Sequence, residues 1–337
     1  MTSCLFDETN VEQSLRPIER QPRLPREFRG YSLNVAARLE ASLPHFLLHI
    51  YFANNLSRQV FFAFVAESDL DHLDDFLRRL GVRAPDVLAN VAHLDPLAQV
   101  ARALILLKPK RVLETLFGEC PDGLLGLFGR FGSAPLYGAE TYRLAFELFS
   151  RPENRLRAKV LGQLAGQVRA EHVMVVAGLA DVLVHRATVE RVRHNEVQAL
   201  NSFATMIVDL CDATPLAIKQ SLDALSVGTQ GMKINEWVQN WLARQVRLPV
   251  DPPIPADDPD LRLRIGSEMS SLGRRLRNCA GQRLGFAFVG DRLLYEWNRD
   301  GEQAVIELVR LSSGAEVKWH CDDALRARNR RIKPELA

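Results

Sequence analysis

The chain has 337 residues, of which 47% are hydrophobic and 25% are charged, and its net charge is +2 at pH 7. These values are typical of a folded globular protein with room for two domains, and they exclude disorder over the whole chain. Because the net charge is close to zero, a general electrostatic attraction of the whole protein to nucleic acid or to an anionic membrane is also excluded.

Cysteine usage and apolar runs favour a cytoplasmic protein. The five cysteines are widely spaced and form no Cys-x-x-Cys pair, which argues against a disulfide framework and against a zinc ribbon. The longest apolar run, FLLHIYFA at residues 46–53, is much shorter than the ~20 residues of a membrane-spanning helix. Residues 1–13, MTSCLFDETNVEQ, contain acids at the position where a secretory signal peptide has its basic region, so no signal peptide is predicted. We therefore expect a cytoplasmic location without membrane contact.

A tail comes first along the chain, and a helical domain follows it. Residues 1–31 hold Pro17, Pro22 and Pro25 among arginines, which favours an extended tail. From residue 32 to 247, apolar residues recur at the helical spacing of three and four, which predicts an array of about ten helices. No motif recurs at a constant spacing, so a known repeat family is not indicated.

The clearest single helix is predicted at residues 68–81. Ser68 offers an N-cap oxygen, leucines line one face, and Gly81 suits a left-handed stop. Prolines are predicted to begin further helices, because the first turn does not need their missing N–H. These prolines are Pro85, Pro96, Pro152 and Pro215, the last with Thr214 as its cap.

Residues 248–260, LPVDPPIPADDPD, predict a linker, because so many prolines and aspartates favour neither a helix nor a central strand. Residues 261–337 then predict a helix followed by three or four antiparallel strands, with hairpin turns at Gly290-Asp291 and Asp300-Gly301. A basic helix or tail is expected at the end. The predicted fold class is thus mainly α: a large helical N-terminal domain and a small C-terminal α+β module with an antiparallel meander.

Four stretches of this module carry a family resemblance. They are LGRRLRNCAG at 272–281, RLLYEW at 292–297, AVIELV at 304–309, and EVKWHC at 316–321 with the RARNRRIKPE that follows. In its order of elements the module, over about residues 262–335, resembles the PcfJ-like domain, a family of conjugative plasmids, integrative elements and phages. The resemblance implies the α+β shape and a mobile-element or phage-related setting such as conjugation or defence. It implies no established catalytic activity.

Cys279, His320 and Asp322 are the candidate catalytic residues. A cysteine near a helix end beside arginines, a histidine on a later strand and an acid after it follow the order found in many thiol hydrolases. The alternative is a cysteine packed as a small core residue and a histidine on the solvent face of its strand, and we favour it. A metal site formed by Cys279, His320 and Cys321 is not predicted, because His320 and Cys321 are expected to point to opposite strand faces. No cofactor is expected either.

A basic run is the candidate nucleic-acid interface. Residues 261–337 hold 15 lysines and arginines against 10 acids. Such a run suits contact with phosphates, and aromatic residues on the sheet suit the stacking of single-stranded bases; a solvated surface over an aromatic core is the alternative. The run consists of Arg326, Arg328, Arg330, Arg331 and Lys333, and the aromatic residues are Tyr295, Trp297 and Trp319.

Trp237 and Trp241 form a stripe on a predicted helix, which is a candidate partner-docking face, with core packing as the alternative. The preferred hypothesis is a non-enzymatic binding or scaffold protein. Its helical body would contact a protein partner in a larger assembly. Its basic module would bind single-stranded nucleic acid or a partner. A thiol-dependent hydrolase is the second hypothesis, and a purely structural subunit is the third.

Overall fold

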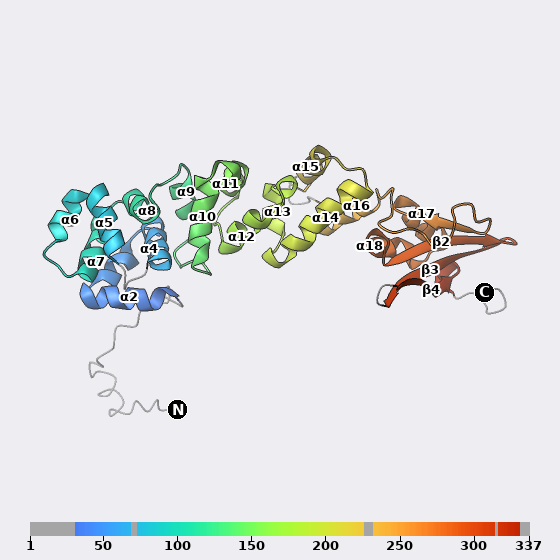
Figure 1. Ribbon diagram of the computed structural model, residues 1–337, viewed down its shortest axis with the longest axis horizontal. Helices are drawn as coiled ribbons and strands as arrows, with labels where there is room; N and C mark the ends of the chain where they lie inside the picture. Colours follow the sequence, from blue (N-terminus) through green and yellow to red (C-terminus); the bar gives the residue numbers. More distant parts are fainter. Residues whose placement is uncertain (1–30, 69–72, 226–231, 314–315, 331–337) are drawn as a thin grey trace, which may run out of the picture. The chain divides into compact units, whose positions relative to one another are not determined.

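The structure is a computed structural model that describes residues 31–68, 73–225, 232–313 and 316–330. The chain divides into two compact units. The first unit holds the residues up to 155 together with 165–170, and the second holds 156–164 and 171–337. Figure 1 shows the helices of both units and the small sheet that follows them in the chain.

The first unit is built from short helices. They are α2 (Tyr31–Ser42), α3 (Phe46–Phe52), α4 (Asn55–Glu67), α5 (Asp74–Arg83), α6 (Pro85–Val91), α7 (Pro96–Leu106), α8 (Pro109–Phe117), α9 (Leu124–Phe128), α10 (Glu140–Ser150) and the 3-10 turn η1 (Pro152–Asn154). Helix α4 supplies much of the core, since Phe61, Phe62 and Phe64 are buried. Phe61 meets Phe46 of α3 edge to face, with ring centroids 5.5 Å apart.

A buried polar contact joins α4 to α10. The hydroxyl of Tyr142 donates to Oε1 of Gln59 at 2.7 Å, and the Gln59 amide donates to the carbonyls of Gly132 and Ala134 at 2.9 and 2.7 Å. The same hydroxyl accepts the N–H of Leu136 at 3.1 Å. The loop before α10 is therefore held by side chains from the core.

The helix predicted at 68–81 is confirmed in part. Helix α5 passes through Gly81 and ends at Arg83, so Gly81 is not its stop. A Cβ on Gly81 would lie 3.0 Å from the Leu88 side chain of α6. A glycine at this position therefore allows α5 and α6 to pack closely. Ser68 is the C-terminal cap of α4, and residues 69–72 lie outside the described residues.

The prediction that four prolines begin helices is confirmed. Pro85, Pro96, Pro152 and Pro215 each stand at the start of a helix, and Thr214 Oγ1 accepts the N–H of Ala217 at 3.1 Å.

The helices of the second unit precede its sheet. They are α11 (Arg155–Gln163), α12 (Ala170–Gly178), η2 (Asp181–Leu183), α13 (Arg186–Arg191), η3 (His194–Glu196), α14 (Val197–Leu210), α15 (Pro215–Asp223) and α16 (Ile234–Leu242). Within the described residues, fifteen α-helices run from α2 to α16, more than the predicted ten, because many have only two turns.

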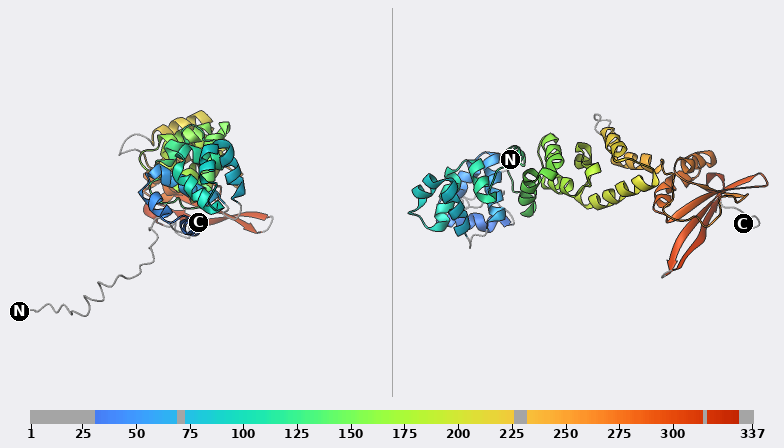
Figure 2. Two further views of the ribbon diagram at one scale, coloured as in Figure 1. Left: turned by 90° about the vertical axis from the view of Figure 1, so that its left-hand side faces the viewer. Right: turned by 45° about the horizontal axis from the view of Figure 1, so that its top comes forward.

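A four-stranded antiparallel sheet of order β1-β2-β3-β4 follows. The elements of this C-terminal module are β1 (Leu261–Arg264), α17 (Ser267–Leu276), η4 (Cys279–Arg283), α18 (Leu284–Phe288), β2 (Arg292–Arg299), β3 (Glu302–Ser313), β4 (Glu316–Leu325) and η5 (Ala327–Asn329). The predicted fold class is confirmed: the protein is mainly α with a C-terminal α+β module. Figure 2 shows β3 and β4 extending beyond β2, whose pairing with β3 ends at Val309.

Two local predictions in the module were wrong. Residues 261–264 form β1 instead of starting a helix. No hairpin forms at Gly290-Asp291, because residues 284–288 form α18, whose Leu284, Ala287 and Phe288 are buried at helical spacing. A short apolar run fits a helix and a strand equally well, so packing decided it. Of the segment predicted as a basic helix or tail, residues 322–325 end β4 and 327–329 form η5, whereas 331–337 lie outside the described residues. The turn at Asp300-Gly301 is confirmed.

The predicted linker at 248–260 does not separate the two compact units, because it packs against the module. The N–H of Asn298 on β2 donates to the carbonyl of Asp260 at 2.9 Å. A Cβ on Gly290 would lie 2.9 Å from Val250. Phe203 of α14 also contacts Phe288 of α18, with centroids 5.4 Å apart. The module and the helices from α12 to α16 therefore belong to one unit.

Candidate nucleic-acid interface

A turn after β4 folds back onto the end of α17. The N–H of Cys279 donates to Oδ1 of Asn329 at 3.2 Å, and the turn is closed by the N–H of Arg326 donating to the carbonyl of Arg330 at 2.6 Å. On the other side, Oδ1 of Asn278 accepts the N–H of Ala280 and so begins η4. Segments 50 residues apart in the chain are thereby held together.

The same two segments hold unusual backbone conformations. Arg277 ends α17 with φ 50°, and Arg328 and Asn329 have φ 60° and 54°. Residues with a Cβ rarely adopt this left-handed region, and such conformations are concentrated at functional sites. The geometry turns the chain sharply on both sides of the Cys279–Asn329 contact.

Arg277, Arg328 and Arg330 are exposed at this junction, and within the described part of the chain none of them has a carboxylate partner. Arg326 differs, because it is only half-exposed and lies 3.0 Å from Glu302. Of the predicted basic residues, Arg328 and Arg330 are thus accessible cations. Arg326 instead forms an ion pair within the module. Arg331 and Lys333 lie outside the described residues.

Four other arginines of the module pair with two buried carboxylates. Glu296 on β2 is 2% exposed and accepts hydrogen bonds from Nε and Nη2 of Arg264 at 2.9 and 2.6 Å, and Arg275 on α17 donates to its other oxygen. Burial acts to raise the pKa of Glu296, but these hydrogen bonds and charges outweigh it and hold its pKa below the usual value. These pairs tie α17 to the sheet.

A second buried carboxylate lies on the neighbouring strand. Glu307 on β3 is 4% exposed and accepts a hydrogen bond from Arg292 at 2.7 Å, and Arg283 of η4 lies 3.5 Å from it. Arg292 also donates to Asp322 of β4 at 2.7 Å. Four of the module's arginines therefore pair with buried carboxylates. Arg262, Arg274 and Arg310 are also exposed; what distinguishes Arg277, Arg328 and Arg330 is that each lies within two residues of Cys279 or Asn329.

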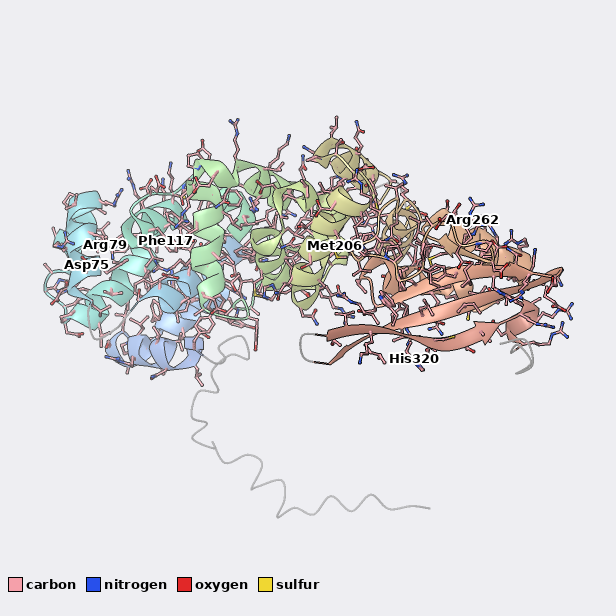
Figure 3. All side chains as sticks on the ribbon, turned by 45° about the vertical axis from the view of Figure 1, so that its right-hand side comes forward. Asp75, Arg79, Phe117, Met206, Arg262 and His320 are labelled. Atoms are coloured by element: carbon pink, nitrogen blue, oxygen red, sulfur yellow. The ribbon has the colours of Figure 1, made fainter. Side chains whose placement is uncertain are left out.

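The three candidate catalytic residues are not assembled into a site. Cys279 is half-buried and lines a cavity of about 10 Å³, which holds about one water molecule and no substrate. His320 is exposed on β4 and does not line that cavity, and Asp322 is paired with Arg292 instead of orienting His320. Figure 3 shows His320 and Arg262, which lie on the two edge strands of the sheet.

The tryptophan stripe is not a docking face, so that prediction was wrong. Trp237 and Trp241 are 2% and 3% exposed, and both indole N–H groups donate to Oγ of Ser221, at 2.8 and 3.2 Å. Phe203 packs against Trp237 with centroids 5.9 Å apart. The two indoles belong to the core of the second unit.

The aromatic residues of the sheet are only partly accessible. Tyr295 is 1% exposed, and its burial raises the pKa of its hydroxyl, so it is a core residue and not a stacking platform. Trp297 and Trp319 are half-buried and keep part of their surface.

Arg277 and Asn329 were not predicted as interface residues. The only sequence signals were an arginine beside Cys279 and an asparagine within the basic run. Nothing local in the sequence shows that these two segments meet.

Among the described residues, no helix is long and apolar enough to cross a membrane, and no group of three or more His, Cys, Asp or Glu side chains is placed to hold a metal ion. The chain matches no family model, and no curated protein or solved structure is significantly similar to it. The resemblance to the PcfJ-like domain therefore stays a prediction from the sequence.

Proposed function

We propose that the chain is a cytoplasmic, non-enzymatic binding protein whose C-terminal module contacts the phosphates of single-stranded nucleic acid through Arg277, Arg328 and Arg330. The observation that carries the proposal is the hydrogen bond from Cys279 to Asn329, because it brings two arginine-bearing segments to one place. The cations there are exposed and unneutralised within the described residues, whereas Arg264, Arg275, Arg283 and Arg292 are paired.

We propose a single strand as the ligand, because unpaired bases can stack on the exposed part of Trp297 or Trp319. Both indoles lie on the sheet face opposite Glu296, which pairs with α17, so this stacking would be separate from the phosphate contacts of the three arginines. The PcfJ-like resemblance adds a setting in a mobile-element or phage-related process. In that setting the first unit would serve protein contacts.

Fluorescence anisotropy with a labelled single-stranded oligonucleotide tests the proposal. Contact with three phosphates predicts a slope of about −2 in a plot of log K against log salt concentration. The double variant Arg328→Glu/Arg330→Glu should bind at least tenfold more weakly and with a shallower slope, as expected for lost phosphate contacts.

The matched control is Arg78→Glu/Lys110→Glu, which makes the same charge change at two exposed cations of the first unit. Equal loss in both double variants would show a general charge effect and contradict the interface. No binding at low salt, or tighter binding to a duplex of equal length, would contradict the single-strand proposal.

A further inference from the structure

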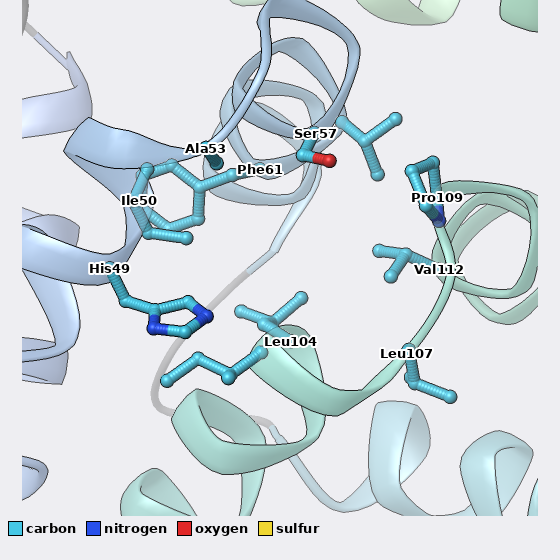
Figure 4. A pocket seen from close by; sticks show the side chains of 11 residues that line it. His49, Ile50, Ala53, Ser57, Phe61, Leu104, Leu107, Pro109 and Val112 are labelled. Carbon is cyan, nitrogen blue, oxygen red and sulfur yellow. The ribbon is translucent and has the colours of Figure 1, made fainter.

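An apolar pocket lies in the first unit between α3, α4 and the segment that joins α7 to α8. Its volume is about 90 Å³. Figure 4 shows Ile50, Phe61, Leu104, Leu107 and Val112 around it. Since a cavity of about 150 Å³ accommodates benzene, this pocket suits one aliphatic side chain or part of an aromatic ring.

Large apolar side chains are exposed on the elements that line the pocket. Leu48, Tyr51 and Phe52 of α3 are 54%, 40% and 77% exposed, and Leu106 at the end of α7 is 48% exposed. Phe52 lies one turn from His49, which lines the pocket. Helix α3 also buries Phe46, Leu47 and Ile50, so it carries apolar side chains on its exposed side as well as on its buried side. A surface helix normally has a polar outer face, so this pattern indicates an interaction surface.

The polar groups that line the pocket are basic or neutral. The carboxylate of Glu40 lies at the start of α3, where it accepts the N–H groups of His45 and Leu47. No carboxylate is among the residues that line the pocket in the described chain; its two polar side chains are His49 and Ser57. Lys108 is exposed next to Pro109 of the lining and has no ion pair among the described residues. Arg58 lies over the Tyr51 ring, 5.3 Å from its centroid, and donates to the carbonyls of Tyr51 and Ala53 at the end of α3. An acidic partner would therefore complement the surface.

We infer that this surface, defined by the pocket with Leu48, Tyr51, Phe52 and Lys108, docks an acidic segment of a partner protein that inserts one leucine or phenylalanine into the pocket. The apolar anchor supplies the affinity, and the acids face Lys108, which sets the orientation. The surface lies in the first unit, so it is independent of the nucleic-acid interface of the second unit.

The test uses the full chain and a short fluorescein-labelled peptide with one phenylalanine flanked by aspartates and glutamates, followed by fluorescence anisotropy at low salt. Phe52→Ser should weaken binding about tenfold, which corresponds to about 1.4 kcal/mol. Lys108→Glu should weaken it by a factor that shrinks as salt rises. A peptide with lysines in place of the acids should bind more weakly than the acidic peptide.

Tyr137→Ser is the matched control, because Tyr137 is an 88% exposed aromatic residue of the same unit that does not line the pocket. It should bind the acidic peptide as the unchanged protein does, and so should Arg328→Glu/Arg330→Glu. The inference is overturned by equal binding of the acidic and lysine peptides, by unchanged binding of Phe52→Ser, by an equal loss in Tyr137→Ser, or by no binding to the unchanged protein.

Discussion

The buried carboxylate of Glu296 gives the most direct test of how the module is held together. Glu296→Gln keeps the shape of the side chain but removes the buried counter-charge of Arg264 and Arg275. Removing one partner of a buried ion pair costs about 3 to 5 kcal/mol. We expect the lower end, about 3 kcal/mol, because Arg275 is half-exposed and Arg264 keeps Glu268 at 3.2 Å.

Urea unfolding followed by tryptophan fluorescence measures this loss in the second unit alone. All four tryptophans of the chain, Trp237, Trp241, Trp297 and Trp319, lie in that unit. With a slope of about 2 kcal/mol/M, a loss of about 3 kcal/mol lowers the midpoint by about 1.5 M. The control is Glu302→Gln, whose 46% exposed side chain pairs with Arg326 and should contribute less than about 1 kcal/mol.

The effect of Glu296→Gln should also depend on pH. The pKa of Glu296 is lower in the folded protein than in the unfolded chain, so the charged form favours folding. The difference between the two proteins should be full above the ordinary carboxyl pKa of about 4.3, and it should be lost as the pH falls through the lower folded value. An unchanged midpoint at pH 7, or an equal loss in Glu302→Gln, would refute the reasoning.

Three further predictions concern other parts of the chain. Tyr142→Phe leaves Oε1 of Gln59 and the Leu136 N–H without their partner and should cost about 1 to 3 kcal/mol; circular dichroism should detect the loss, while the tryptophan transition stays in place. Gly266→Ala should destabilise the second unit strongly, because φ is +50° and a Cβ would lie 2.6 Å from the Gln245 carbonyl, whereas Gly285→Ala, which meets no atom within 4 Å, should change the urea midpoint little. Burial raises the pKa of Cys211 to about 11, so its alkylation by iodoacetamide, followed by mass spectrometry, should be slow at pH 8 and accelerate as the pH rises; rapid alkylation at pH 8 would contradict this.

The local features of the fold could be predicted because their causes lie within a few residues. A proline fixes a first helical turn whatever packs against it, so Pro85, Pro96, Pro152 and Pro215 marked helix starts correctly. Asp300 and Gly301 tolerate the positive φ of a tight turn, so the hairpin between β2 and β3 was also predictable. The change from helices to a basic α+β module followed from the composition after residue 260.

Tertiary packing decided everything that needs two distant segments. The run at 284–288 suits a helix or a strand alone, and its burial against β2 and α14 made it α18. Trp237 and Trp241 were predicted as a candidate docking face, but the fold buries both and places Ser221 where its Oγ accepts both indole N–H groups. The meeting of Arg277 with the turn at 326–330, and the pocket between α3, α4 and α7, follow only from three-dimensional contacts. The physical reason is that capping and turn preferences act between near neighbours, whereas burial and charge pairing depend on which distant side chains the fold brings together.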